Sequence, residues 1–203
     1  MARICKSLIG ASALALLAGG ASAATIYASS VTAISGAEAM SCTTAERTAD
    51  RTNICNGLGA PDGDADMGGG IGFVSAGNFD SLTFGFDQPF RSPITVFEIT
   101  GNRNPSYVEG LDLVFAVEAG GSYNYGTITN IMGVPGSDDD QWAITVEFEN
   151  TGPFTAITVF DNSTTPDGFD IDAIGVSAVP LPAAGFMLLA GLGGLAAARR
   201  RRG

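Results

Sequence analysis

The chain has no histidine, and its one lysine, Lys6, lies close to the amino terminus. The absence of histidine excludes Ser-His-Asp and Cys-His catalytic arrangements and histidine-bearing zinc sites. Without lysine beyond residue 6, Schiff-base and Ser-Lys mechanisms are excluded as well. Catalysis by Asp and Glu carboxyl groups is the main enzyme mechanism that this composition leaves open. The composition therefore argues against most classes of enzyme.

Positive charge is almost as scarce in the middle of the chain. Residues 24–178 contain four arginines and all twenty-one acidic residues, which gives a formal charge of −17. Such a surface repels phosphate backbones and anionic lipid headgroups, so we expect no nucleic-acid partner. Divalent cations are its natural partners, while the plainer alternative is that the acidity keeps an exported protein soluble.

The amino-terminal residues 1–23 have the three parts of a secretory signal peptide. Arg3 and Lys6 form a positive region, residues 8–18 are apolar, and Ala21, Ser22 and Ala23 form a small-residue cleavage site. We therefore expect a signal helix that is removed, export of the protein, and a mature chain that begins at Ala24.

The carboxy-terminal residues 179–203 have an equally clear order. An apolar run over residues 183–198 follows two prolines and ends at four consecutive arginines. As a helix this run reaches roughly 24 Å, somewhat short of the ~30 Å hydrocarbon core, and the arginines keep its end cytoplasmic. The proline motif consists of Val179, Pro180, Leu181, Pro182 and Ala183, and the basic stop of Arg199, Arg200, Arg201 and Arg202.

This order of motif, transmembrane helix and basic tail resembles the PEP-CTERM family of bacterial sorting signals, in its VPLPA variant. Leu181 stands where the commoner form has glutamate. The resemblance implies recognition by exosortase, a membrane-embedded protease that removes the tail. It also implies a Gram-negative bacterium, a precursor anchored in the inner membrane, and a final place at the cell surface or in an exopolysaccharide biofilm matrix. An ordinary single-span tail anchor is the alternative.

Two cysteines, Cys42 and Cys55, lie between these terminal segments. An even number of cysteines in an oxidising compartment predicts a disulfide, here closing a loop of fourteen residues. The only stretch that favours helix, residues 43–50, lies inside this loop, and we expect one or two turns there at most.

Residues 24–178 otherwise follow a β pattern. Short runs rich in β-branched and aromatic residues are separated by Gly, Pro, Asn and Asp. This favours an all-β domain, an antiparallel β-sandwich of jelly-roll type with about nine strands. The predicted strands are residues 25–35, 70–76, 81–86, 94–100, 111–118, 122–130, 142–149, 154–160 and 169–177. The domain is also similar to exported β-sandwiches that often precede PEP-CTERM tails, a group without a shared catalytic motif.

Aspartates near the two ends of this domain predict a structural calcium site. Asp170 and Asp172 alternate in the last predicted strand, at the rim where the strand enters the core. Asp62, Asp64 and Asp66 add further hard oxygen ligands of the kind that calcium prefers. The set is not an EF-hand, because Met67 and Phe73 occupy the glycine and glutamate positions of that loop. The alternative is that these aspartates simply form turns.

Two further kinds of residue bear on function. Tyr123 and Tyr125 share one strand face and are candidates for stacking on sugar rings, whereas we assign Trp142 to the core. Five glutamates are available for the two-carboxylate chemistry of a glycosidase, although strand acids usually point outward into solvent. They are Glu98, Glu109, Glu118, Glu147 and Glu149.

The sequence thus predicts an exported, non-enzymatic surface or extracellular-matrix protein. A lectin-like module that binds carbohydrate is the first alternative. A carboxylate glycoside hydrolase acting on the matrix polysaccharide is the second.

Overall fold

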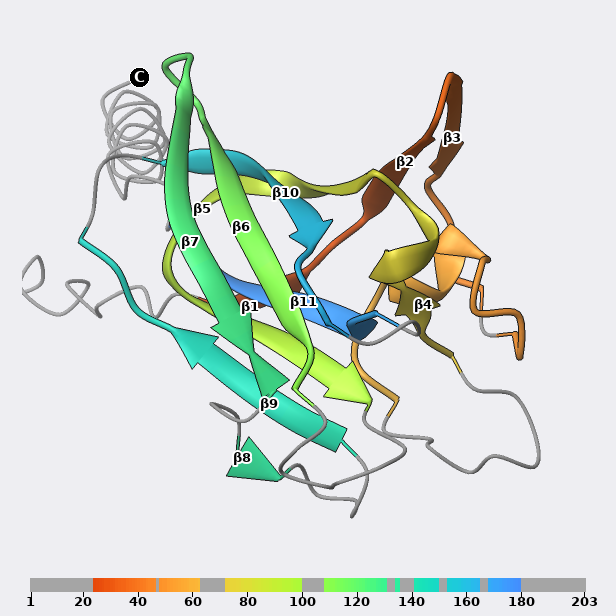
Figure 1. Cartoon of the computed structure of the whole chain (residues 1–203). Helices are drawn as coiled ribbons and strands as arrows, with labels where there is room; N and C mark the ends of the chain where they lie inside the picture. The colour runs from red at the N-terminus through yellow and green to blue at the C-terminus, as the bar shows by residue number, and fades with distance from the viewer. Residues whose placement is uncertain are drawn as a thin grey trace, which may run out of the picture. The chain divides into compact units, whose positions relative to one another are not determined.

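One long strand, β5 (Ser81–Ile99), joins the whole domain (Figure 1). Its first half pairs with β2 (Ser30–Ser35) and β10 (Phe154–Asp161). Its second half pairs with β9 (Gln141–Val146) and β11 (Asp170–Ala178). The strand changes partners after a register shift, where Gly85 lies opposite Ala156 but Phe90 lies opposite Phe154. Every pairing is antiparallel, and β5 is central on both sides of the shift.

This computed structural model describes residues 24–46, 48–62, 72–99, 108–130, 134–135, 141–149, 153–164 and 168–179. Within these ranges the protein is all-β, with eleven strands and two short 3-10 helices, η1 (Ile54–Gly57) and η2 (Ala76–Asn78). None of the described residues form a helix long and apolar enough to cross a membrane. The expected signal helix and transmembrane helix lie outside the described residues.

The strands form two layers that share β5, as in a β-sandwich. The first layer has the order β3-β2-β5-β10-β6-β7, and the second has the order β1-β11-β5-β9-β8 with β4 beside the start of β11. The remaining strands are β1 (Thr25–Tyr27), β3 (Glu38–Cys42), β4 (Val74–Ser75), β6 (Gly110–Val117), β7 (Ser122–Thr129) and β8 (Val134–Pro135).

The core lies between the layers and follows the alternation that the sequence predicts. In most strands that face the core, side chains at every second position point inward, and their apolar members are buried. Burying them removes their apolar surface from water, which is the main force holding the two layers together. The inward series include Leu82 and Phe84, Ile94 and Val96, Leu111 and Leu113, Ile144 and Val146, and Ile157 and Val159.

The all-β prediction is confirmed, but three strand boundaries differ. The expected first strand, residues 25–35, is divided, because β1 pairs with β11 in one layer and β2 pairs with β5 in the other. The chain crosses between the layers at Ala28, which donates to Ile174 O, and Ser29, which donates to Gly85 O. The predicted strands 81–86 and 94–100 are parts of the single strand β5. Of the predicted strand 70–76, the described residues contribute only β4.

The count of nine strands was too low, chiefly because β3 and β8 were not predicted. Four of the five residues of β3 are exposed, and β8 has two residues. Neither therefore produces the apolar alternation by which a half-buried strand is found in a sequence.

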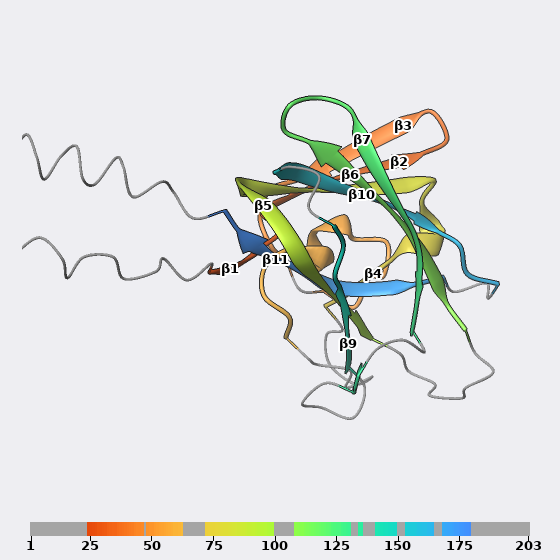
Figure 2. The ribbon, with the colours of Figure 1, turned by 90° about the vertical axis from the view of Figure 1, so that its left-hand side faces the viewer.

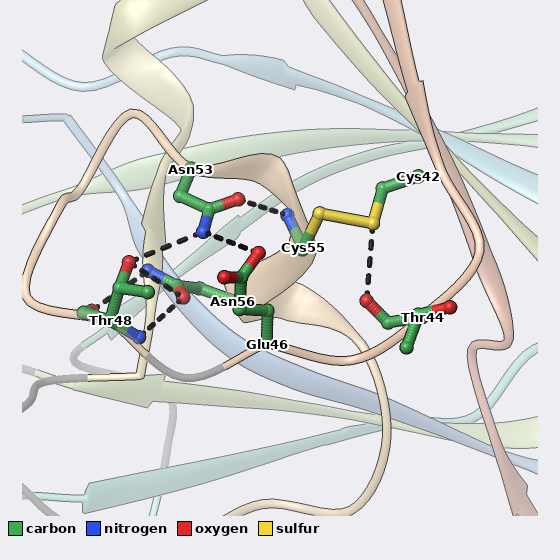
Figure 3. Close-up of a disulfide and its surroundings, with 7 residues drawn as sticks. All are labelled: Cys42, Thr44, Glu46, Thr48, Asn53, Cys55 and Asn56. Atoms are coloured by element: carbon green, nitrogen blue, oxygen red, sulfur yellow. Dashed lines mark hydrogen bonds between the residues drawn. A yellow bond between two sulfur atoms is a disulfide. The ribbon is translucent and has the colours of Figure 1, made fainter.

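The disulfide between Cys42 and Cys55 is confirmed, with the two Cα atoms 5.6 Å apart (Figure 3). It ties the end of β3 to η1. The helix expected at residues 43–50 is wrong, since none of the described residues in that range are helical.

The buried Asn56 side chain explains why these residues are not helical. Its Nδ2 donates to Thr48 O at 3.1 Å, and its Oδ1 accepts from Thr48 N at 3.0 Å (Figure 3). The same Nδ2 donates to Asp50 O at 2.9 Å. Nδ2 also donates to Phe73 O at 3.0 Å. These bonds satisfy backbone groups that a helix would otherwise use within itself, so the loop takes its shape from Asn56.

We expect the Cys42→Ser/Cys55→Ser double variant to fold but to lose stability. By loop-closure entropy a loop of this length contributes about 3 kcal/mol to the free energy of unfolding. For a domain of this size that corresponds to a melting temperature lower by roughly 6 to 12 °C. Thermal unfolding under non-reducing conditions measures the difference, and equal melting temperatures for variant and wild type would contradict it.

Candidate functional site

Three inward-facing series of the core end in acidic residues. On β5 the series Ile94, Val96 continues to Glu98, and on β10 the series Ile157, Val159 continues to Asp161. Glu109 lies two residues before Leu111 at the start of β6. Because alternation continues without a register shift over these segments, all three carboxyl groups point between the layers. The core therefore changes from apolar to acidic at one end of the strands.

Glu109 is held in this position by its backbone. Its N–H donates to Asn130 Oδ1 at 3.2 Å, and the N–H of Asn130 donates to Glu109 O at 3.1 Å. Only 3% of Glu109 is exposed, and Glu98 is fully buried. Glu109 comes from the first layer, and the segment of β5 that carries Glu98 belongs to the second. The two glutamates thus meet across the interior.

Burial raises the pKa of Glu109 to about 9, because a charged carboxylate is poorly solvated there. The negative charges of Glu98 and Asp170 raise this pKa further, as do a hydrogen bond with Glu98 and the charge of Asp161. Glu109 is therefore protonated at neutral pH. In that state its hydroxyl is able to donate to Glu98.

Asp170 and Asp172, expected at the rim of the fold, are both buried, with 4% and 0% of their surface exposed. Asp170 is the first residue of β11, and this strand is buried on both faces from Asp170 to Val176, with η1 packed against it. Asp170 forms an ion pair with Arg51, with 2.8 Å between Oδ2 and Nη2. The guanidinium of Arg51 also lies over the ring of Phe73, 4.8 Å from its centroid.

The structure brings part of the predicted calcium set together. Asp172 Oδ2 accepts a hydrogen bond from the backbone N–H of Asp62 at 3.2 Å. Asp64 and Asp66 lie outside the described residues. Among the residues that are described, no three His, Cys, Asp or Glu side chains converge closely enough to form a metal centre. Calcium at the aspartate set remains a prediction.

Tyr123 and Tyr125 are half-buried at the opposite end of the core. Both rings pack on Phe148, with centroid distances of 5.8 and 6.1 Å. Tyr123 also contacts Phe115 and Phe154, whose rings pack on the buried Phe90. The two tyrosines thus form the outer part of an aromatic cluster. The side chain of Trp142 lies outside the described residues.

The five glutamates considered for hydrolysis are not equivalent. Glu118, Glu147 and Glu149 are exposed, as expected of strand acids, whereas Glu98 and Glu109 are buried against that expectation. The signal for this was present in the sequence, because both continue an inward apolar alternation. What the sequence did not reveal is that two such series end at the same place.

Of the sorting motif, the structure describes Val179, whose N–H donates to Pro89 O at 2.9 Å. Pro180, Leu181, Pro182 and Ala183 lie outside the described residues, as do Arg199, Arg200, Arg201 and Arg202. The chain matches no protein-family model, and a search of curated proteins finds no significant match.

We expect the Glu109→Gln variant to be more stable than the wild type at pH 8 in the presence of a chelator. The folded protein keeps a proton that the unfolded chain, with a pKa of 4.5, releases. The contribution of Glu109 to stability is therefore complete below pH 4.5 and falls as the pH rises towards 9. The slope is at most about 1.4 kcal/mol per pH unit for one group.

Chemical denaturation at pH 5 and at pH 8 measures this effect. The loss of stability between the two pH values should be smaller in Glu109→Gln than in the wild type. Glu147→Gln, the same change at an exposed position, should follow the wild type. Identical pH profiles for Glu109→Gln and wild type would show that Glu109 is not protonated in the folded protein.

Proposed function

We propose that the protein is an exported, non-enzymatic surface or matrix protein of a Gram-negative bacterium, delivered by a signal peptide and sorted by an exosortase. The observation that carries this proposal is the position of the two ends of the described domain. Strand β1 pairs with β11, and Ala178 N donates to Ala24 O at 3.0 Å (Figure 2). Residues 1–23 and 180–203 are therefore attached to neighbouring points of the domain.

This arrangement suits removal of both segments. Residues 24–179 form a compact unit, and its limits coincide with the predicted processing points at Ala23 and the proline motif. Cleavage at either point leaves the terminal strands β1 and β11 whole. The domain then keeps all the described strand pairings after processing, as an exported protein requires. The jelly-roll form of the β-sandwich is part of the same proposal.

A structural role fits the carboxylates better than hydrolysis does. Glu98 and Glu109 meet, but both are buried, so a polysaccharide chain does not reach them. A glycosidase needs two carboxyl groups on either side of a bound sugar. The charge of −17 over residues 24–178 also keeps an exported domain soluble and away from anionic surfaces. Association with an exopolysaccharide matrix follows from the sorting signal that the chain resembles.

Carbohydrate binding at Tyr123 and Tyr125 is the second candidate function. Both tyrosines keep part of their surface exposed although their rings pack on Phe148. Stacking on aromatic rings is a common way to hold a sugar ring.

We expect the protein recovered from the cell surface to begin at Ala24 and to end near Pro182. Intact mass spectrometry of protein made with an exosortase present measures both ends. Without an exosortase, and in the Pro180→Ala/Pro182→Ala variant, the tail should remain attached. Surface protein that still carries Arg199–Arg202 in the exosortase-positive host would contradict the proposal.

If the tyrosines bind sugar, Tyr125→Ala should weaken retention on immobilised matrix polysaccharide by about tenfold, as expected for loss of one stacking contact. Tyr27→Ala, on β1 in the other layer, is the matched control and should be retained like the wild type. Equal retention of all three proteins would remove Tyr125 from any glycan site. Melting curves of both variants check that the fold is intact.

A further inference from the structure

The outer face of the first layer carries an exposed aromatic ring in register with polar side chains. Asp112 on β6 lies opposite Phe160 on β10 and, on its other side, opposite Thr127 on β7 (Figure 1). Residues directly opposite each other in antiparallel strands project from the same face, with Cβ atoms about 4.5–5.5 Å apart. The neighbouring residues Leu111 and Val159 are buried in the core, so this row points away from it. The row therefore forms a strip on the surface.

Hydrogen bonds fix the polar part of this strip. Thr127 Oγ1 donates to Asp112 Oδ1. Asn162, which directly follows β10, donates from Nδ2 to Asp112 Oδ1 at 3.3 Å and to Asp112 Oδ2 at 3.4 Å. The same Nδ2 lies 3.3 Å from Thr127 Oγ1. Because the three side chains hold one another in one arrangement, little conformational entropy is left to lose when a ligand binds.

The backbone holds Asn162 beside Asp112. Asn162 N donates to Gly110 O at 2.9 Å, and Ser163 Oγ accepts from Gly110 N at 3.0 Å. Ser163 Oγ also donates to Asp161 Oδ1 at 2.7 Å. Gly110 permits this close approach, since a Cβ atom at that position would lie 3.0 Å from Asn162 O. The segment after β10 is thus attached to the start of β6, and the polar cluster is preformed.

The strip offers a ligand both an apolar surface and hydrogen-bond acceptors. Phe160 is 40% exposed, which makes it one of the few large apolar side chains on the surface of the described residues. An exposed apolar residue is ordinary by itself, but here preformed polar groups lie next to the ring. Asp112 Oδ2 accepts one hydrogen bond among the described residues, whereas a carboxylate oxygen accepts up to two. The amide of Asn162 adds a carbonyl oxygen.

These features match a neutral sugar. A pyranose has a face of C–H groups that packs on an aromatic ring, and hydroxyl groups at its edge that donate to carboxylate and amide oxygens. The formal charge of −17 over residues 24–178 disfavours an anionic polysaccharide. It also disfavours a second copy of this chain, which carries the same charge. A neutral glycan meets no such repulsion.

We propose that Phe160, Asp112 and Asn162 bind one residue of a neutral glycan on the outer face of the first layer. Phe160 stacks on the sugar ring, and the oxygens of Asp112 and Asn162 accept hydrogen bonds from its hydroxyl groups. Thr127 keeps the carboxylate in place. This site is separate from Tyr123, whose ring packs on the aromatic cluster of the core. It depends neither on the proposed sorting nor on sugar binding by the tyrosines.

An array of neutral hexose, deoxyhexose and N-acetylhexosamine glycans, probed with the purified protein, tests the site. We expect binding to at least one of these glycans and none to alginate, the anionic control. Affinity electrophoresis in gels that contain the bound glycan then gives dissociation constants. Phe160→Ala, Asp112→Ala and Asn162→Ala should each raise the dissociation constant about tenfold, as expected for loss of one contact.

Matched controls separate stacking from general apolar adhesion. Phe160→Tyr keeps an aromatic ring and should bind like the wild type. Ile34→Ala removes an apolar side chain that is 45% exposed on β2 of the same layer, and it should also leave binding unchanged. Melting curves check that each variant folds. Should Asp112→Ala fail to fold, Asn162→Ala, at an exposed position, must show the weakened binding.

Four results would overturn the proposal. They are a wild-type protein that binds none of the neutral glycans, Phe160→Ala that binds as tightly as the wild type, an equal loss in Ile34→Ala and Phe160→Ala, and a loss in Tyr125→Ala with normal binding in Phe160→Ala. The third would indicate apolar adhesion or self-association, and the fourth would place the glycan at the tyrosines. Since purified protein is used, failure here leaves the prediction of tail removal untouched, and a retained tail leaves glycan binding untouched.

Discussion

The pairing of β5 with both layers is the constraint on which the rest of the structure depends. Its first half pairs with β2 and β10, and its second half pairs with β9 and β11. Since the same strand serves both, the layers cannot separate or slide without breaking its hydrogen bonds, and a slip of one residue would turn every inward side chain outward. The position of the core, and of both of its ends, follows from this one strand.

The interior that results has two unlike ends. Around Phe90, Phe115 and Phe154 it is filled by aromatic rings, and at Glu98 and Glu109 it is acidic. The aromatic end adjoins the point where the domain begins and finishes, since Phe90 lies opposite Ala178 and Val179 bonds to Pro89. The acidic end lies at the start of β11, eight residues earlier along the strand. Packing of aromatic rings stabilises the first end. At the second end, stability depends on the charge of the buried carboxyl groups.

The two ends of the core are formed by different parts of the chain. The terminal strands β1 and β11 pair at the aromatic end. The acidic end is formed by strand termini, away from the paired terminal strands. The disulfide loop supports both by packing η1 against β11 and by placing Arg51 beside Asp170. A single loop closed by Cys42 and Cys55 thereby fixes the covered face of the last strand.

The sequence by itself determined the all-β class, the disulfide and most strand positions, because alternation, turn residues and cysteine count are local properties of the chain. It also predicts a signal peptide and a sorting segment at the two termini, which lie outside the described residues. Tertiary structure decided that residues 81–99 form one strand, that residues 25–35 divide between two layers, and that Asn56 displaces a helix at residues 43–50. It also decided that Asp170 and Asp172 are buried and that Glu98 meets Glu109. Each of these depends on which distant segment lies alongside, and periodicity within one segment contains no information about its neighbour.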